Sequence, residues 1–187
     1  MDIRWYSINS IGSVEFQCGY CGNAVASDQG YFAQQRLEGL EARIYICPHC
    51  ACPTFFHGDS YSPHVAPGNE VQHLPDEIQS LYREARNCVA AHAYTASVLA
   101  CRKLLMNIAV AQGAGEGLRF IEYVDYLAKE GFVPPNGRHW VDHIRKKGNE
   151  ATHEILLMGS EDAIELISFS EMLLKFIFEF PAQVPRQ

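Results

Sequence analysis

The 187-residue chain lacks the hydrophobic runs that a membrane protein needs. Its longest apolar run, Met172–Phe178, is far shorter than a bilayer span and contains Lys175. The N-terminal residues Met1–Trp5 lack the basic start and apolar stretch of a signal peptide. We therefore expect a soluble cytoplasmic protein that has no membrane partner.

Excess positive charge is missing as well. Asp and Glu number 22 against 15 Lys and Arg, which gives a formal net charge of -7. A protein that coats nucleic acid non-specifically would be basic, so attraction of the whole molecule to phosphate is excluded. The composition of a disordered chain is also missing, because hydrophobic residues make up 48% of the sequence.

The seven cysteines do not suggest a disulfide framework, because their number is odd and no export signal precedes them. Four of them form two Cys-x-x-Cys pairs, Cys18/Cys21 and Cys47/Cys50. Two such pairs can close a tetrahedron of thiolates around one structural Zn²⁺, with no position left for substrate. The sequence thus predicts one zinc ion per chain, and paired redox or incidental cysteines are the alternative interpretation.

Other residues near these pairs leave the ligand set open at one point. Cys52 could replace Cys50 as a ligand, although the matched spacing of the two pairs favours Cys50. His49 lies inside the second pair and is expected to point outward. Cys88 and Cys101 fall on predicted helices, where cysteine is usually a small core residue.

The rest of the pattern predicts a small β zinc ribbon followed by an all-α helical bundle. Short strands are expected at 14–16, 42–46 and 53–56, where apolar residues alternate or cluster beside the cysteine pairs. We assign the ribbon to residues 1–58 and a Pro-, Gly- and Ser-rich linker to 59–75. Helical periodicity then predicts a domain over 76–187, with helices at about 76–92, 94–112, 118–129, 138–148 and 160–180.

The most informative helical stretch surrounds Arg145, Asn149 and His153. Positions four apart share one face of a helix, so these three side chains would line a single stripe beside Lys146 and Lys147. A cation, an amide and an imidazole together could bind a phosphate and transfer a proton. A solvated basic face with an ordinary half-buried histidine is the alternative.

The segment Arg145-x-x-Gly148-Asn149-x-x-x-His153, preceded by a helix pair with Glu84 and Arg102, resembles a known family. It is similar to the HEPN-superfamily domain of unknown function (family 4145) of bacteria, which occurs beside or within restriction and phage-defence proteins. Its members frequently carry an N-terminal zinc ribbon. The resemblance covers nearly the whole chain.

Active HEPN nucleases dimerise so that two Arg-polar-x-x-x-His motifs face each other, and they cleave RNA without a metal. The resemblance aligns His153 with the family's histidine and Asn149 with its polar residue, whereas Gly148 takes the place of its arginine. This departure counts against catalysis, although Arg145 or Lys147 could substitute.

Two functions follow from the resemblance. The first is a homodimeric interaction module in a defence or restriction context, which binds a partner protein or a nucleic acid. The second is a metal-independent endoribonuclease, in which His153 acts as general acid or base and leaves a cyclic phosphate. There Asn149 would orient the phosphate, while Arg145 or Lys147 stabilises the charge that develops on it.

Overall fold

The computed structural model describes residues 3–34, 41–134, 137, 140–142 and 157–184. The chain divides into two compact units, Met1–Ala66 and Pro67–Gln187. We refer to them as the sheet unit and the helical unit and describe each by itself.

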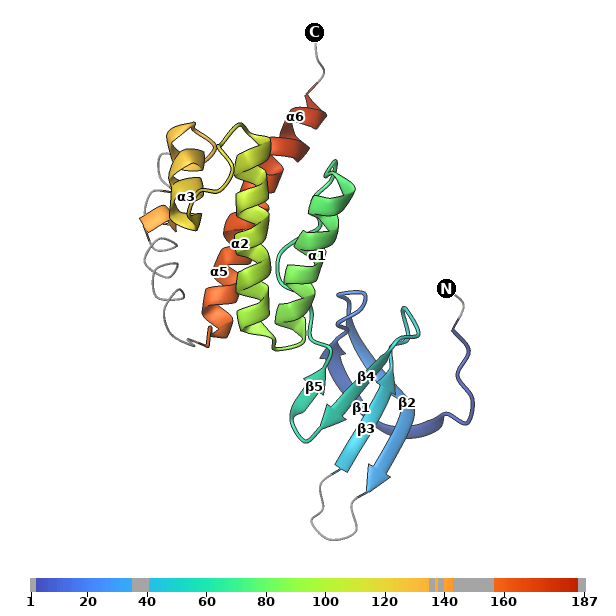
Figure 1. Cartoon of the computed structure of the whole chain (residues 1–187). Coiled ribbons are helices and arrows are strands. Elements are labelled where there is room, and N and C mark those ends of the chain that lie inside the picture. Colours follow the sequence, from blue (N-terminus) through green and yellow to red (C-terminus); the bar gives the residue numbers. More distant parts are fainter. Residues whose placement is uncertain (1–2, 35–40, 135–136, 138–139, 143–156, 185–187) are drawn as a thin grey trace. The chain divides into compact units, whose positions relative to one another are not determined.

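The sheet unit is a single antiparallel sheet in which the strands follow one another in chain order (Figure 1). Its strands are β1 (Asn9–Gln17), β2 (Ala24–Gln34), β3 (Glu41–Ile46), β4 (Pro53–His57) and β5 (Ser60–Ser62). The connections from β1 to β2 and from β3 to β4 carry the two cysteine pairs, so both pairs lie at the same end of the sheet. The ladder of β3 with β4 agrees with the strands expected from the sequence, while β2 and β5 were not expected.

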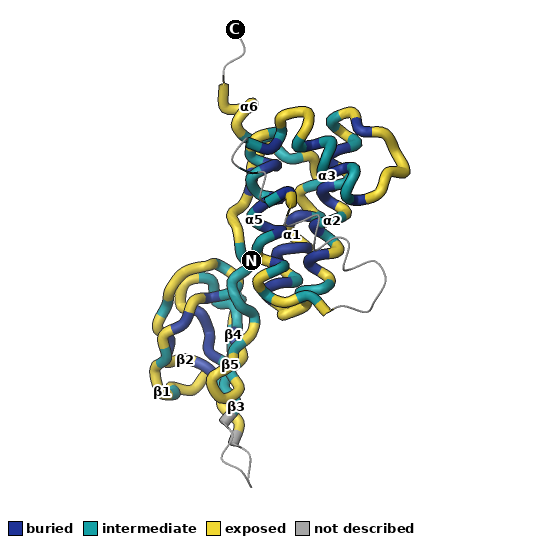
Figure 2. Tube along the Cα trace, turned by 90° about the vertical axis from the view of Figure 1, so that its left-hand side faces the viewer, coloured by how far each residue is buried: buried dark blue, intermediate teal, exposed yellow. Residues whose placement is uncertain are grey.

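The helical unit is built around α2 (Tyr94–Ala111), which packs against three other helices (Figure 1). These are α1 (Asp76–Ala90), α3 (Phe120–Lys129) and α5 (Ser160–Leu174). The buried positions of α1, α2 and α5 face one another and form one hydrophobic core (Figure 2). Where the residues are described, the bounds agree with the helices expected from periodicity to within two residues at most ends. The helix expected at 138–148 lies mostly outside the described residues.

The last predicted helix differs from expectation near its end. After α5 the chain makes a π-helical turn, Lys175–Glu179, and then the short helix α6, Phe180–Gln183. Pro181 lies within the first turn of α6, whereas the sequence suggested that it would follow the helix. Proline has no N–H to donate, but it is tolerated in the first turn of a helix. The wider π-helical turn that precedes α6 leaves room for the ring of Pro181.

Residues 67–75 run along the helical unit, and we call this segment the strap. Val71 is only 1% exposed and belongs to the core of the helical unit. The buried Arg86 of α1 donates to the carbonyl oxygens of Pro67 at 2.7 Å and Gly68 at 2.9 Å. It also pairs with the carboxylate of Glu70 at 2.5 Å.

The strap is bound on its other side by carboxylates of the C-terminal helices. Glu171 accepts hydrogen bonds from the backbone N–H and the side-chain amide of Asn69, both at 2.9 Å. Glu179 accepts one from the backbone N–H of Gln72 at 2.7 Å. The predicted linker at 59–75 is thus structured at both ends, because β5 begins it and the strap completes it.

Gly68 shows how closely the strap is packed. Its φ of 74° lies in the left-handed region, which glycine adopts without strain. A Cβ at this position would lie 2.8 Å from a carboxylate oxygen of Glu171 and 2.9 Å from the hydroxyl of Tyr82. Both the conformation and the space therefore require glycine.

Within the described part of the chain, none of the helices combines the length and hydrophobicity that a membrane span requires.

Candidate metal centre

Four cysteine sulfurs converge between the β1–β2 and β3–β4 connections. The Sγ atoms of Cys18, Cys21, Cys47 and Cys50 all lie within 4.8 Å of one another. Cys18 and Cys50 are 3.7 Å apart and Cys21 and Cys47 are 3.8 Å apart, far beyond the roughly 2.05 Å of a disulfide. Four sulfurs at about 2.3 Å from one ion form a tetrahedron with edges of about 3.8 Å, so the cluster has the dimensions of a four-thiolate metal site.

The first cysteine pair lies in a tight loop closed by two backbone hydrogen bonds. Cys18 donates its N–H to the carbonyl of Asn23 at 2.9 Å, and Gly22 donates to the carbonyl of Cys18 at 2.8 Å. Gly22 takes the left-handed conformation, with a φ of 72°. The side-chain amide of Asn23 lies 3.6 Å from the sulfur of Cys21, where it can donate to a thiolate.

The second cysteine pair lies in a loop with the same two backbone hydrogen bonds. Cys47 donates to the carbonyl of Cys52 at 2.9 Å, and Ala51 donates to the carbonyl of Cys47 at 2.9 Å. Cys52 therefore corresponds to Asn23 in the first loop. Its backbone closes the loop, and its sulfur is not part of the four-sulfur cluster, which contains Cys50 instead. His49 is exposed, in keeping with the expectation that it points outward.

Burial affects the pKa values of three of these thiols. It raises the pKa of Cys18 and of Cys50. Burial acts in the same direction on Cys21 but is outweighed by hydrogen bonds from the Asn23 backbone N–H and the neighbouring thiols, which lower its pKa to about 6. A metal ion must displace the remaining protons, because cysteine binds metals as thiolate.

The sulfur cluster is also the centre of the small hydrophobic core of the sheet unit. The buried residues of this core are Phe16, Cys18, Tyr45 and Cys47. Phe56 packs edge-on against the rings of Phe16 and Tyr45, with centroids 5.4 and 5.2 Å apart. Since two of the four buried residues are cysteines of the cluster, a bound metal would cross-link the core itself.

The candidate catalytic residues Arg145, Asn149 and His153 lie outside the described residues, as do Lys147 and Gly148. Arg102, named in the family resemblance, is described. Its guanidinium lies 4.6 Å from the ring centroid of Phe120, and burial lowers its pKa. The contact is a cation–π interaction with α3.

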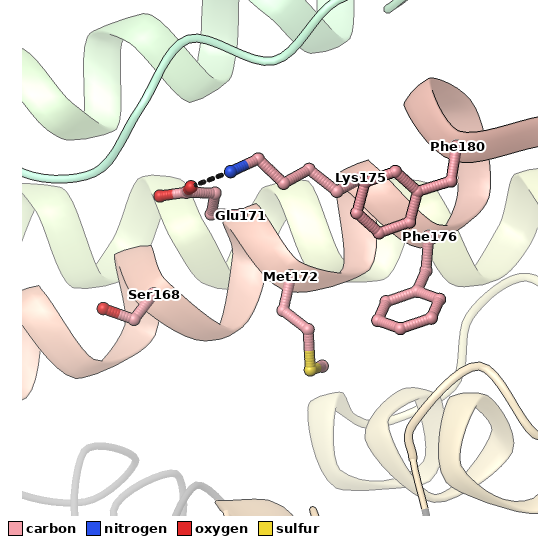
Figure 3. Close-up of a pocket in the computed structure, with 6 residues that line it drawn as sticks. All are labelled: Ser168, Glu171, Met172, Lys175, Phe176 and Phe180. Atoms are coloured by element: carbon pink, nitrogen blue, oxygen red, sulfur yellow. Dashed lines mark hydrogen bonds and ion pairs between the residues drawn. The ribbon is translucent and has the colours of Figure 1, made fainter. Parts of the chain in front are cut away.

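Among the described residues, the C-terminal helices carry a hollow of about 350 Å³ (Figure 3). It is lined by Ser168, Glu171, Met172, Lys175, Phe176 and Phe180. Lys175 and Glu171 form an ion pair within it, and the rings of Phe176 and Phe180 meet edge to face at 5.4 Å. Hydrogen bonds from Lys175 and Asn69 outweigh the burial of Glu171 and lower its pKa, so this carboxylate stays charged.

Comparison with known proteins places the helical unit in a family. No curated protein and no solved structure matches the chain. A family model does match residues 83–187, more than half of the chain, and it covers the second half of α1 and each later helix of the described residues. The chain therefore belongs to the family described as Domain of unknown function (DUF4145).

Proposed function

We propose that the four cysteines bind one structural Zn²⁺ per chain, so that the sheet unit is a zinc ribbon. The match of the sulfur separations to a tetrahedron of thiolates supports a metal. Four-sulfur tetrahedral sites take zinc or iron, and zinc is the usual ion where the site has only a structural role. A site with four protein ligands has no open position at which substrate could be activated.

We further propose that the protein is an interaction module of the bacterial cytoplasm, with a HEPN-like helical domain that forms a homodimer in a defence or restriction context. The observation that carries this proposal is the closed four-sulfur cluster, since a site without an open position can organise a binding surface but cannot catalyse. Such a homodimer would present two zinc ribbons, one from each chain, to a partner.

A protein partner is favoured over nucleic acid by charge. The sheet unit contains three arginines, no lysine and six acidic residues, a formal net charge of -3. Such a surface repels a phosphate backbone, whereas protein partners are recognised largely by apolar and hydrogen-bonding contacts. Salt-dependent binding to RNA or DNA would count for the nucleic-acid alternative.

The dimer is the first testable element. We expect light scattering at micromolar concentration to give twice the chain mass of 21.0 kDa. The family resemblance implies an interface near the residues from Arg145 to His153, where a glycine such as Gly148 would allow close helix approach. Gly148→Leu is therefore expected to shift the protein toward the monomer. Gly115→Leu is a matched control, because a side chain there meets nothing within 4 Å. A monomeric wild type would contradict the proposal.

The ribonuclease alternative rests on the spacing of Asn149 and His153, and it can be tested directly. We expect wild type to leave mixed RNA as intact as His153→Ala does, in magnesium-free buffer with EDTA at a level that does not change the zinc content. An imidazole needs a neighbouring cation to stabilise the phosphorane, and the family's arginine is replaced by Gly148.

The opposite result would have a clear signature. Cleavage by wild type that is lost in both His153→Ala and Arg145→Ala, while Lys103→Ala retains it, would establish the nuclease. Lys103 is an exposed residue of α2, so its loss controls for the removal of one positive charge. Equal cleavage by all variants would indicate a contaminant.

A further inference from the structure

An N-terminal residue contacts the metal centre from outside the cysteine loops. The indole Nε1 of Trp5 donates a hydrogen bond to the backbone carbonyl of Ala51 at 2.7 Å. The Trp5 ring also packs against Tyr31 of β2, with centroids 6.2 Å apart. The hydroxyl of Tyr31 in turn donates to the carbonyl of Tyr6. The segment before β1 is therefore attached both to the sheet and to the second loop.

Ala51 is the strained residue of that loop. Its φ of 59° is in the left-handed region, which residues with a Cβ rarely adopt. At the equivalent position of the first loop stands Gly22, which adopts this conformation freely. The two loops have the same backbone hydrogen bonds. The second loop therefore carries a conformational strain at Ala51 that the first avoids with Gly22, and it needs a stabilising contact from outside the loop.

We propose that Trp5 is a positioning residue for the metal centre, which holds the second loop closed through the Ala51 carbonyl and so slows metal release from Cys47 and Cys50. The inference rests on the proposed zinc site. It is also reciprocal, because a contact that stabilises the bound state must itself be stabilised by the metal. Trp5 should then be held against Ala51 more firmly while the ion is bound.

The first measurement is the rate at which a chelator in excess, with a colorimetric zinc indicator, extracts zinc from the full-length protein. Trp5→Phe keeps an aromatic ring against Tyr31 but removes the donor to Ala51. We expect zinc release about threefold to tenfold faster, the effect of one lost hydrogen bond. Trp140→Phe is the matched control, because Trp140 packs against Phe169 in the helical unit. We expect it to release zinc at the wild-type rate.

A rescue variant separates loop positioning from a general loss of stability. In the Trp5→Phe background, Ala51→Gly removes the left-handed strain and is expected to restore slow release. Ala91→Gly, in the C-cap residue of α1, is the matched control and is expected to leave release fast. Rescue by both or by neither would overturn the proposal.

The reciprocal measurement leaves Trp5 intact. The chain has two tryptophans, so Trp5 is the single indole in Trp140→Phe. We expect its emission to shift to longer wavelength when zinc is removed and to return when zinc is added. Unchanged emission, or equal release rates in wild type and Trp5→Phe, would overturn the role of Trp5 while the zinc site stands. A wild type that binds no zinc would overturn both.

Discussion

Removal of zinc is expected to unfold the sheet unit and to leave the helical unit folded. Among the described residues, the hydrophobic core cluster of the sheet unit contains four buried residues, so little apolar burial offsets the conformational entropy lost on folding. A structural zinc ion contributes on the order of 10 kcal/mol to the folding of such small modules. Without the ion, Cys18 and Cys47 no longer cross-link this core.

The measurement combines elemental analysis with circular dichroism and NMR before and after chelation. We expect one zinc per chain, loss of the dispersed sheet-unit resonances on chelation, and an almost unchanged helical signal. Cys18→Ser should reproduce the metal-free state, and Cys52→Ser should keep the full zinc content because its sulfur is outside the cluster. An absence of metal, or a Cys18→Ser variant with undiminished zinc, would disprove the site.

Replacement of Arg86 by alanine is expected to destabilise the helical unit by about 3 kcal/mol. Arg86 is 8% exposed and makes hydrogen bonds to Pro67, Gly68 and Glu70 of the strap. Hydrogen bonds of a charged group contribute about 1.5–3 kcal/mol each, and the loss of the guanidinium removes the donor from the carbonyls of Pro67 and Gly68. Glu70 is 60% exposed, so water screens its ion pair with Arg86. The expected loss of stability therefore stays near the lower end of what three such hydrogen bonds could contribute.

Chemical unfolding followed by far-UV circular dichroism gives the free energy of unfolding for this variant. Arg83→Ala is the matched control on the same helix, because Arg83 is exposed and its removal should change stability by no more than about 0.5 kcal/mol. Arg86→Lys keeps the charge but loses the planar fork, so it should fall between the two. Equal stability of Arg86→Ala and Arg83→Ala would show that the strap does not stabilise the helices.

The four-cysteine cluster was predictable because its information is local. A Cys-x-x-Cys pair predicts a tight loop wherever it occurs, and two such loops need only meet once to form the site. The choice between Cys50 and Cys52 followed from the same spacing, and the structure adds that the Cys52 carbonyl is used by the backbone. Helix bounds were predictable for a similar reason, since periodicity and end signals lie within each segment.

Features that depend on distant residues escaped prediction. β2 contains Asp28, Gln29 and Gly30, which interrupt alternation, and its strand conformation comes from its pairing with β1 and β3. The strap reads as a linker by composition, because its partners Glu171 and Glu179 lie more than 100 positions further on. The support that Trp5 gives to Ala51 has no sequence signal either, since the two are 46 positions apart.

The strap also bears on where the helical unit begins as a separable part of the chain. Residues 67–82 belong to the helical unit by their contacts, yet they precede the segment that the family model matches. A chain in which another domain replaced the sheet unit could be joined after Ala66, but a junction at the start of α1 would remove Val71 and the strap residues Pro67, Gly68 and Glu70 that Arg86 contacts. Gly68 and Arg86 thus stabilise the helical unit through contacts that lie wholly within it, whatever domain precedes Pro67.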